Sequence, residues 1–213
     1  MRKIVLQEMM SLDGFMAGPK GEFDWPLADE EFEWHTNDLL NAADTLLLGR
    51  SAYQMFASYW PTAASSASGT MKNSDGVEFT VPTSVSNAHD EVARKMSAYR
   101  KIVFSKTLEG VQWNNSILVR EVDPKEITRM KEQPGKNMVV LGSSELVWSL
   151  MKSRLIDEYR VWVNPIILGR GKSLFGALDD RHKLKLAETK TFGSGLIELY
   201  LQASKVTAFV GVE

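Results

Sequence analysis

Residues 136–151, with the sequence KNMVVLGSSELVWSLM, pass from an apolar run into a glycine turn and then into a helix. Residues 138–141 are apolar and rich in β-branched side chains, which predicts a buried strand. Gly142 ends this run, and Ser143 and Ser144 supply oxygens suited to the N-cap of a helix. Such a turn aims free backbone N–H groups and the positive end of the helix dipole at one point, where a phosphate can bind. An ordinary junction that binds nothing has the same pattern, so the turn alone does not establish a site.

The same order of strand, glycine and helix recurs along the chain. Residues 45–48 form a second apolar run, Gly49, Arg50 and Ser51 form its turn, and a helix is predicted over residues 52–59. Further strands are predicted at residues 3–10, 101–105, 116–120 and 156–167, and further helices at residues 29–41, 88–99 and 124–131. Residues 183–191 and 195–203 alternate apolar and polar side chains, which predicts an antiparallel hairpin. We therefore predict an α/β three-layer sandwich, with a mostly parallel central sheet, helices on both faces and a C-terminal antiparallel hairpin.

No convincing boundary divides the chain, so residues 1–204 are expected to form a single domain and residues 205–213 a tail. The segment 62–87 is rich in Ser, Ala, Thr and Gly, and we predict an irregular excursion there. Residues 11–25 combine turn-forming glycines with large apolar side chains. That combination is more typical of a lid or binding loop than of a plain connection, although such a loop can also fold onto the core.

Composition excludes several classes of function. The chain of 213 residues has a formal net charge of -2 and no cysteine. Without a basic excess we expect neither nucleic acid nor a membrane as partner, and without cysteine there is no disulfide, thiol nucleophile or thiolate metal site. The three histidines are scattered without metal-ligand spacing, so no metal is expected. The apolar run in MRKIVLQEMM is too short for a signal peptide, and the cytoplasm is the expected location.

Polar or glycine turns follow four of the predicted strands, and parallel strands bring such turns to one edge of a sheet. These turns are Gly49 with Arg50, Ser105 with Lys106, Gly142 with Ser143 and Ser144, and Gly169. Arg50 and Lys106 form a cationic pair suited to phosphate groups, although either residue alone is more typical of a surface ion pair. The usual dinucleotide fingerprint, the esterase elbow and a complete P-loop are absent from the sequence.

A carboxylate beside a large aromatic ring offers a second kind of site. Asp24, Trp25 and Asp29 could bind a heteroaromatic ring by stacking and hydrogen bonding. In the plain alternative, Trp25 is a core residue and Asp29 is an acid in the first turn of a helix.

Four motifs, TLLLGRSAYQMF, KIVFSK, MVVLGSSELVWSLM and IDEYRVWVNPIILGRGKSLF, occur in this order after the loop SLDGFMAGPKGEFDW. Together they resemble the dihydrofolate reductase-like superfamily, and more closely the reductase domain of bacterial riboflavin biosynthesis and its small stand-alone relatives. The resemblance covers residues 1–204 apart from the excursion. It implies a single domain that binds NADPH, an activity like that of 5-amino-6-(5-phosphoribosylamino)uracil reductase or dihydrofolate reductase, and a homodimer.

The resemblance also implies which residues meet NADPH. The turns at Arg50 and Gly142 would meet its phosphates, and Ser105 and Lys106 would hold the 2′-phosphate and so favour NADPH over NADH. The family commonly has two glycines where Gly142 and Ser143 stand, sometimes joined by a cis bond. The full implied set is Met9, Ser11, Ala17, Gly49, Arg50, Ser51, Ser105, Lys106, Leu141, Gly142, Ser143, Ser144, Leu146, Pro165, Ile167 and Gly169.

We therefore predict an NADPH-dependent reductase that acts on a small heteroaromatic or carbonyl substrate. The substrate would lie among Asp24, Trp25, Phe32 and Tyr53, and Asp29 or water would supply the proton. The cofactor carries the hydride chemistry, so the protein has mainly to position the rings and exclude water. True dihydrofolate reductase activity and a non-catalytic nucleotide-binding module stay open as alternatives. Asp29 is the best match for the carboxylate that serves folate, but its spacing from Trp25 is one residue short.

Overall fold

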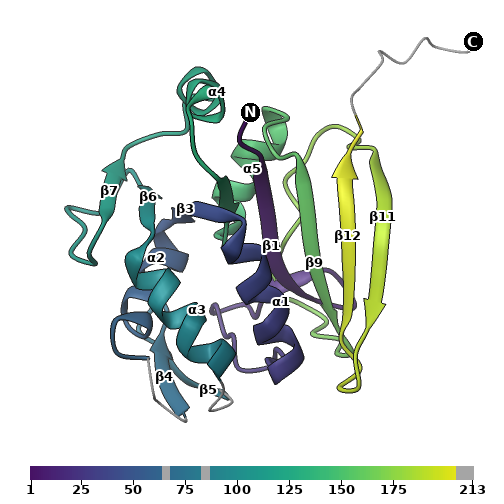
Figure 1. Cartoon of the computed structure of the whole chain (residues 1–213). Coiled ribbons are helices and arrows are strands. Elements are labelled where there is room, and N and C mark those ends of the chain that lie inside the picture. Colours follow the sequence, from purple (N-terminus) through teal and green to yellow (C-terminus); the bar gives the residue numbers. More distant parts are fainter. Residues whose placement is uncertain (64–67, 83–86, 205–213) are drawn as a thin grey trace, which may run out of the picture.

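The structure of the chain is a computed structural model, which describes residues 1–63, 68–82 and 87–204. Within these residues, the central sheet has eight strands in the order β11-β12-β9-β1-β8-β3-β6-β7 (Figure 1). The predicted tail, residues 205–213, lies outside the described residues. In chain order the strands of this sheet are β1 (Ile4–Ser11), β3 (Ala43–Gly49), β6 (Arg100–Phe104), β7 (Ser116–Val119), β8 (Asn137–Val140), β9 (Glu158–Asn164), β11 (Leu184–Thr191) and β12 (Ile197–Ala203).

Most strand pairs in this sheet are parallel. β1 lies parallel to β8 and β9, and β3 lies parallel to β8 and β6. β7 extends the parallel part beside β6, while β12 is antiparallel to both β9 and β11. The prediction of a mostly parallel sheet with a C-terminal antiparallel hairpin is confirmed. The strands β1, β3 and β8 are buried on both faces, which is why their sequences are nearly continuous apolar runs.

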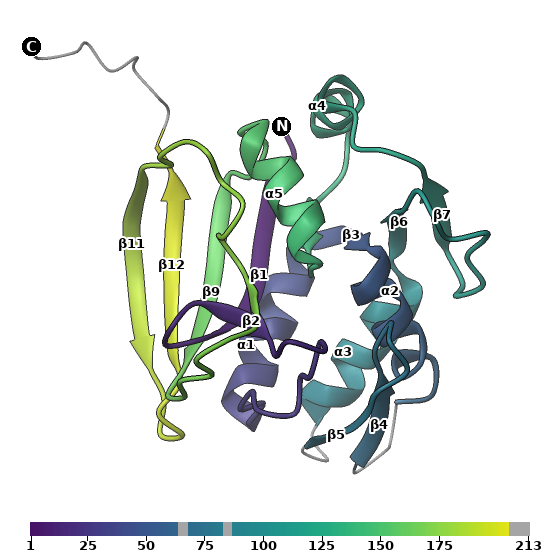
Figure 2. The ribbon, with the colours of Figure 1, turned by 180° about the vertical axis from the view of Figure 1, so that it is seen from behind.

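Helices cover both faces of the sheet, as predicted (Figures 1 and 2). α1 (Glu30–Asn41) and α3 (Asn87–Ala98) lie on one face, and α4 (Pro124–Glu132) and α5 (Ser144–Lys152) lie on the other. α2 (Arg50–Ala57) follows β3 directly and leads into the 3-10 helix η1 (Trp60–Thr62). Among the described residues, no helix combines the length and the apolar character that a membrane span requires.

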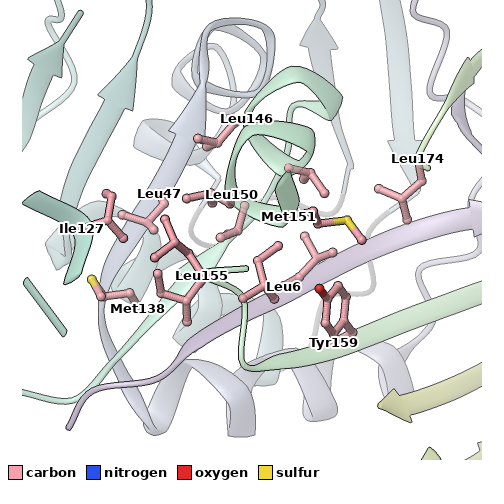
Figure 3. Packing of buried hydrophobic residues seen from close by; sticks show 14 of the residues in the cluster. Leu6, Leu47, Ile127, Met138, Leu146, Leu150, Met151, Leu155, Tyr159 and Leu174 are labelled. Carbon is pink, nitrogen blue, oxygen red and sulfur yellow. The ribbon is translucent and has the colours of Figure 1, made fainter. Parts of the chain in front are cut away.

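The packing of α5 shows how the core fixes the ends of the strands (Figure 3). Leu146, Leu150 and Met151 share one face of this helix and pack against Leu6 of β1 and Leu47 of β3. All five side chains are at most 3 % exposed, and each contributes about 1.5–3 kcal/mol by leaving water. Because α5 follows β8 after a short turn, this packing holds the first turn of the helix at the carboxyl end of the sheet.

The loop over residues 11–25 is hydrogen-bonded to the segment that follows β9. Within the loop, β2 (Phe15–Ala17) is antiparallel to β10 (Lys172–Ser173). Asp13 makes a second contact with this segment. Its carboxylate accepts hydrogen bonds from the backbone N–H groups of Leu168, at 3.1 Å, and Gly169, at 2.7 Å. These contacts hold the loop over the end of the sheet toward which β1 runs (Figure 2).

The structure differs from the predicted irregular excursion over residues 62–87, because this segment holds a hairpin. β4 (Ser68–Lys72) is antiparallel to β5 (Glu78–Pro82), and Met71 lies opposite Phe79. Both side chains are buried and pack in a cluster with Tyr59. Met71 and Phe79 stand among so many Ser, Thr and Gly residues that their pattern is too weak to be recognised. The hairpin lies at the same end of the sheet as β2 (Figure 2).

Candidate functional site

A cavity of about 360 Å³ lies at the carboxyl ends of the parallel strands. Gln7, Glu8 and Met9 of β1 line it, together with the first residues of α2 and α5. Further lining residues come from α1, α3, β2 and the hairpin of β4 and β5. Ligands of open parallel sheets bind outside the carboxyl ends of the strands, so this cavity is the candidate functional site.

Two helix N-termini meet at this cavity. α2 begins at Arg50 directly after β3, and α5 begins at Ser144 after β8. The N–H of Gly49 donates to the carbonyl of Gly142 at 2.9 Å, which joins the two turns. A Cβ atom on Gly49 would lie 2.2 Å from Oγ of Ser143, so only glycine allows this close approach. Gly142 has a φ of 74° and is joined to Ser143 by a cis peptide bond.

The first turns of both helices are open to a ligand. Neither of the N-cap residues, Gly49 and Ser143, makes a side-chain cap hydrogen bond. Their leading backbone N–H groups therefore have no side-chain cap, and two positive dipole ends point toward one cavity. Arg50 and Lys172 also line the cavity and add positive charge. Free N–H groups, converging dipoles and cations together suit a pyrophosphate.

Glu8 lies beside these turns. The parallel register pairs Leu6 of β1 with Val140 of β8, which brings Glu8 level with Gly142. Its side chain is buried, and Oε1 has no hydrogen-bond partner among the described residues. Burial raises the pKa of Glu8 from 4.5 to about 8, and a backbone hydrogen bond with Gly142 opposes part of that rise. Most molecules therefore carry a neutral carboxylic acid at this position at pH 7.

A chain of buried polar contacts links α1, α3 and the segment after α2. Nδ1 of His89 lies 3.0 Å from Oε1 of Glu33, and Nε2 of His89 lies 3.1 Å from the hydroxyl of Tyr59. All three residues are buried and line the cavity. Because each ring nitrogen of His89 has a partner, the orientation of the imidazole is fixed.

The wall around this chain is largely apolar and suits a planar ring. It is formed by Phe23, Phe32, Met55, Phe56, Trp60, Met71, Val92 and Met96. The cavity thus has a polar end built from backbone turns and an apolar end built from side chains.

Comparison with known proteins identifies the family of this chain. Residues 2–197 match the family model of the RibD C-terminal domain. The chain belongs to the RibD C-terminal domain family. It is 30% identical over 198 residues to YyaP, an uncharacterized protein of Bacillus subtilis (strain 168), and the match covers 93% of each chain.

Solved structures share the fold of this RibD-family chain at low sequence identity. A deaminase/5-amino-6-(5-phosphoribosylamino)uracil reductase of Thermotoga maritima is 17% identical with a TM-score of 0.61, covering 95% of this chain and 57% of that one. A dihydrofolate reductase of Enterococcus faecalis, complexed with NADP(H), is 13% identical with a TM-score of 0.54, covering 95% and 97%. The resemblance stated from the sequence is confirmed for family and fold.

The cavity of the RibD-family chain brings together nine of the residues predicted from the sequence. They belong to β1, β2 and α1 and to the two turns, and their roles stay predictions. The nine are Met9, Ala17, Phe32, Arg50, Ser51, Leu141, Gly142, Ser143 and Ser144.

Asp29 and Tyr53 have other partners. The carboxylate of Asp29 caps α1 by accepting a hydrogen bond from the N–H of Phe32 at 2.8 Å. The hydroxyl of Tyr53 accepts hydrogen bonds from the backbone N–H groups of Gln112 and Trp113. Neither Asp29 nor Tyr53 is among the described residues that line the cavity. The structure therefore favours the helix-acid alternative for Asp29.

Several further predicted residues also lie outside the lining. Ser11 and Ser105 hydrogen-bond to nearby backbone N–H groups, and Leu146 is buried in the core. Asp24 and Trp25 line a separate depression, which the loop of residues 11–25 forms together with Leu168 and Arg170. The rest are described residues that do not line the cavity, namely Gly49, Lys106, Pro165, Ile167 and Gly169.

The cavity residues that were missed from the sequence include Glu8, Glu33, Tyr59, His89 and Lys172. A signal existed for Glu8, because Gln7 and this carboxylate interrupt a largely apolar strand. A weaker signal existed for His89, which shares the buried face of α3. Nothing in the local sequence pairs Glu33 with His89, because their contact joins two helices that are far apart in the chain.

Proposed function

We propose that this RibD-family chain is an NADPH-dependent reductase that transfers a hydride to a small heteroaromatic or carbonyl substrate. The observation that carries the proposal is the meeting of the α2 and α5 N-termini at the cavity, with Arg50 and Lys172 beside them. A dinucleotide needs a site for its pyrophosphate, and this arrangement offers one made mainly of backbone N–H groups.

Particular residues would hold NADPH. Arg50, Ser51 and the turn of Gly142 to Ser144 would take the phosphates, and Met9 and Ala17 would lie toward the nicotinamide. Ser105 and Lys106 would meet the 2′-phosphate, because β6 is the neighbour of β3 and its carboxyl end lies at the same edge. NADPH, when bound, supplies the hydride, and the protein orients the rings and excludes water.

The apolar end of the cavity would hold the substrate. Phe32 and the other aromatic side chains there can stack on a planar ring, while Glu33 and His89 offer polar contacts. The sequence alternative of dihydrofolate as substrate depends on Asp29, whose carboxylate caps a helix. A C=N or C=O bond in a pyrimidine-type substrate is therefore the preferred target. The expected homodimer stays a prediction.

Binding calorimetry with NADPH and NADH tests the cofactor site. Wild-type protein should bind NADPH more tightly than NADH. Arg50→Ala should weaken both about 10- to 150-fold, since a charged hydrogen bond contributes about 1.5–3 kcal/mol and 1.4 kcal/mol is tenfold. Lys106→Ala should weaken NADPH binding alone.

A matched control removes a cation elsewhere. Arg129 is an exposed arginine of α4, paired with Glu126, and Arg129→Ala should leave both affinities unchanged. Failure of wild-type protein to bind either nucleotide would refute the proposal. Tight NADPH binding without oxidation by 5-amino-6-(5-phosphoribosylamino)uracil, dihydrofolate or simple aldehydes would favour the non-catalytic module.

A further inference from the structure

We infer that Glu8 is the acid that donates a proton to the substrate as the hydride arrives. The inference rests on the proposed reductase function and assigns a step that Asp29 was predicted to perform. Glu8 lies in β1, lines the cavity and is next to the Gly142 turn.

The carboxyl group of Glu8 lacks the partners that a structural carboxylate has. Its side chain is 7 % exposed, and Oε1 is buried without a hydrogen-bond partner among the described residues. Buried polar atoms in proteins are nearly always paired, so an unpaired one requires an explanation. Oε1 lies beside Gly142, only 3.2 Å from where a Cβ atom on that glycine would be. Glu8 also lines the cavity, so its carboxyl group lies next to the space that a ligand would occupy.

The other charged groups that line the cavity are less suited to the step. Glu33 and His89 contact each other, and Asp75 and Glu145 are exposed. Arg50 and Lys172 are cations, which suit phosphates. No side chain in the described residues makes an ion pair or a hydrogen bond with Glu8. Burial therefore raises the pKa of Glu8, and only the backbone hydrogen bond with Gly142 opposes that rise.

The chemistry balances with Glu8 as donor. The hydride that bound NADPH would supply would add to the carbon of a C=N or C=O bond, and the electron pair of that bond would move to the nitrogen or oxygen. The O–H bond of Glu8 breaks as the new N–H or O–H bond forms, which leaves a Glu8 carboxylate and oxidised nicotinamide. Water reprotonates the carboxylate when product leaves. An acid with a pKa of about 8 is protonated at neutral pH yet gives up its proton readily.

The experiment compares wild type, Glu8→Gln and Glu8→Asp, with Glu188→Gln as a control. Glu188 is an exposed glutamate of β11, outside the cavity lining. The probe is 5-amino-6-(5-phosphoribosylamino)uracil, and the readouts are NADPH affinity, single-turnover NADPH oxidation and its dependence on pH. Glu8→Gln should lower turnover about 10²–10⁴-fold, the usual range for a general acid, with the Kd for NADPH unchanged within about threefold. Wild-type turnover should fall as the pH rises through about 8, and this limb should vanish in Glu8→Gln and shift in Glu8→Asp.

Each result separates the two proposals. Wild-type turnover that Glu8→Gln retains, with the same pH limb, would overturn the role of Glu8 and leave the reductase function standing. NADPH binding without wild-type turnover of the probe, dihydrofolate or an aldehyde would refute the reductase function and the role of Glu8 with it. A carbon-13 NMR titration of the Glu8 carboxyl is the second measurement. A midpoint near the ordinary 4.5 would overturn the acid role whatever the activity.

Discussion

Replacing Glu8 with glutamine should flatten the dependence of folding stability on pH. In the folded chain the pKa of Glu8 is about 8, against 4.5 as the ordinary value. Between these two pH values the folded state holds more protons at this site than the unfolded state does. In this range the unfolded state releases the proton of Glu8 while the folded state keeps it. Rising pH therefore favours the unfolded state, and the free energy of unfolding falls from about pH 4.5 to about pH 8.

The magnitude follows from the size of this shift. One pKa unit corresponds to about 1.4 kcal/mol, so a rise from 4.5 to about 8 gives a loss of at most about 5 kcal/mol across this range. Water that enters the cavity solvates the carboxylate and reduces the loss, so we expect about 2–5 kcal/mol. Glutamine is close to glutamate in size and does not titrate, so Glu8→Gln should remove this component and retain the fold.

Urea unfolding of both proteins at several pH values from about 5 to about 9 measures the effect. The difference in unfolding free energy between Glu8→Gln and wild type should grow in favour of the variant as the pH rises. Other titrating groups cancel in this difference, including Lys101, whose pKa is lowered to about 8 by burial. A difference that stays constant over the whole pH range would show that Glu8 titrates normally and would refute the argument from burial.

Three other substitutions test separate parts of the structure. Gly49→Ala places a methyl group 2.2 Å from Oγ of Ser143, so it should destabilise the fold by about 1–3 kcal/mol and weaken NADPH binding; unchanged urea unfolding and affinity would contradict this. Lys101→Met removes the donor to three backbone carbonyls and the cation over the ring of Trp113, and urea unfolding at pH 7 should show a loss of about 2–4 kcal/mol; a neutral result would mean that water replaces the amine. Phe79→Ala should speed amide hydrogen exchange in β4 and β5 while the central sheet stays protected, and equal effects in both would show that the hairpin does not open alone.

The parts of the fold that were predictable are those that local patterns encode. The run before Gly142 is apolar because β8 is buried on both faces, and the residues after it keep helical spacing because α5 buries one face. Both patterns are local, so the elements and the turn between them could be predicted. The hairpin of β4 and β5 was missed because its contribution to the core is confined to a few residues such as Met71 and Phe79.

The same distinction explains which half of the candidate site was predictable. The polar end is made of backbone N–H groups at helix N-termini, and a glycine after an apolar run marks such a turn in any sequence. Gly49 and Gly142 were therefore identified, although their contact was not. The apolar end is made of side chains such as Glu33 and His89, whose pairing depends on how α1 and α3 pack. No spacing rule connects residues across two such helices.

This division between the two ends of the cavity has a consequence for substrate choice within the family. A phosphate site built from backbone groups tolerates most side-chain changes, provided that the glycine positions are kept, because the N–H groups come from every residue type except proline. A wall built from Phe32, Glu33 and His89 changes its shape and its hydrogen-bonding groups with each substitution. With the proposed function, members of the family could keep one cofactor and diverge in substrate. Substitutions in the apolar wall should alter the KM of the substrate while the Kd for NADPH stays constant, and an equal change in both constants would show that the two ends are not independent.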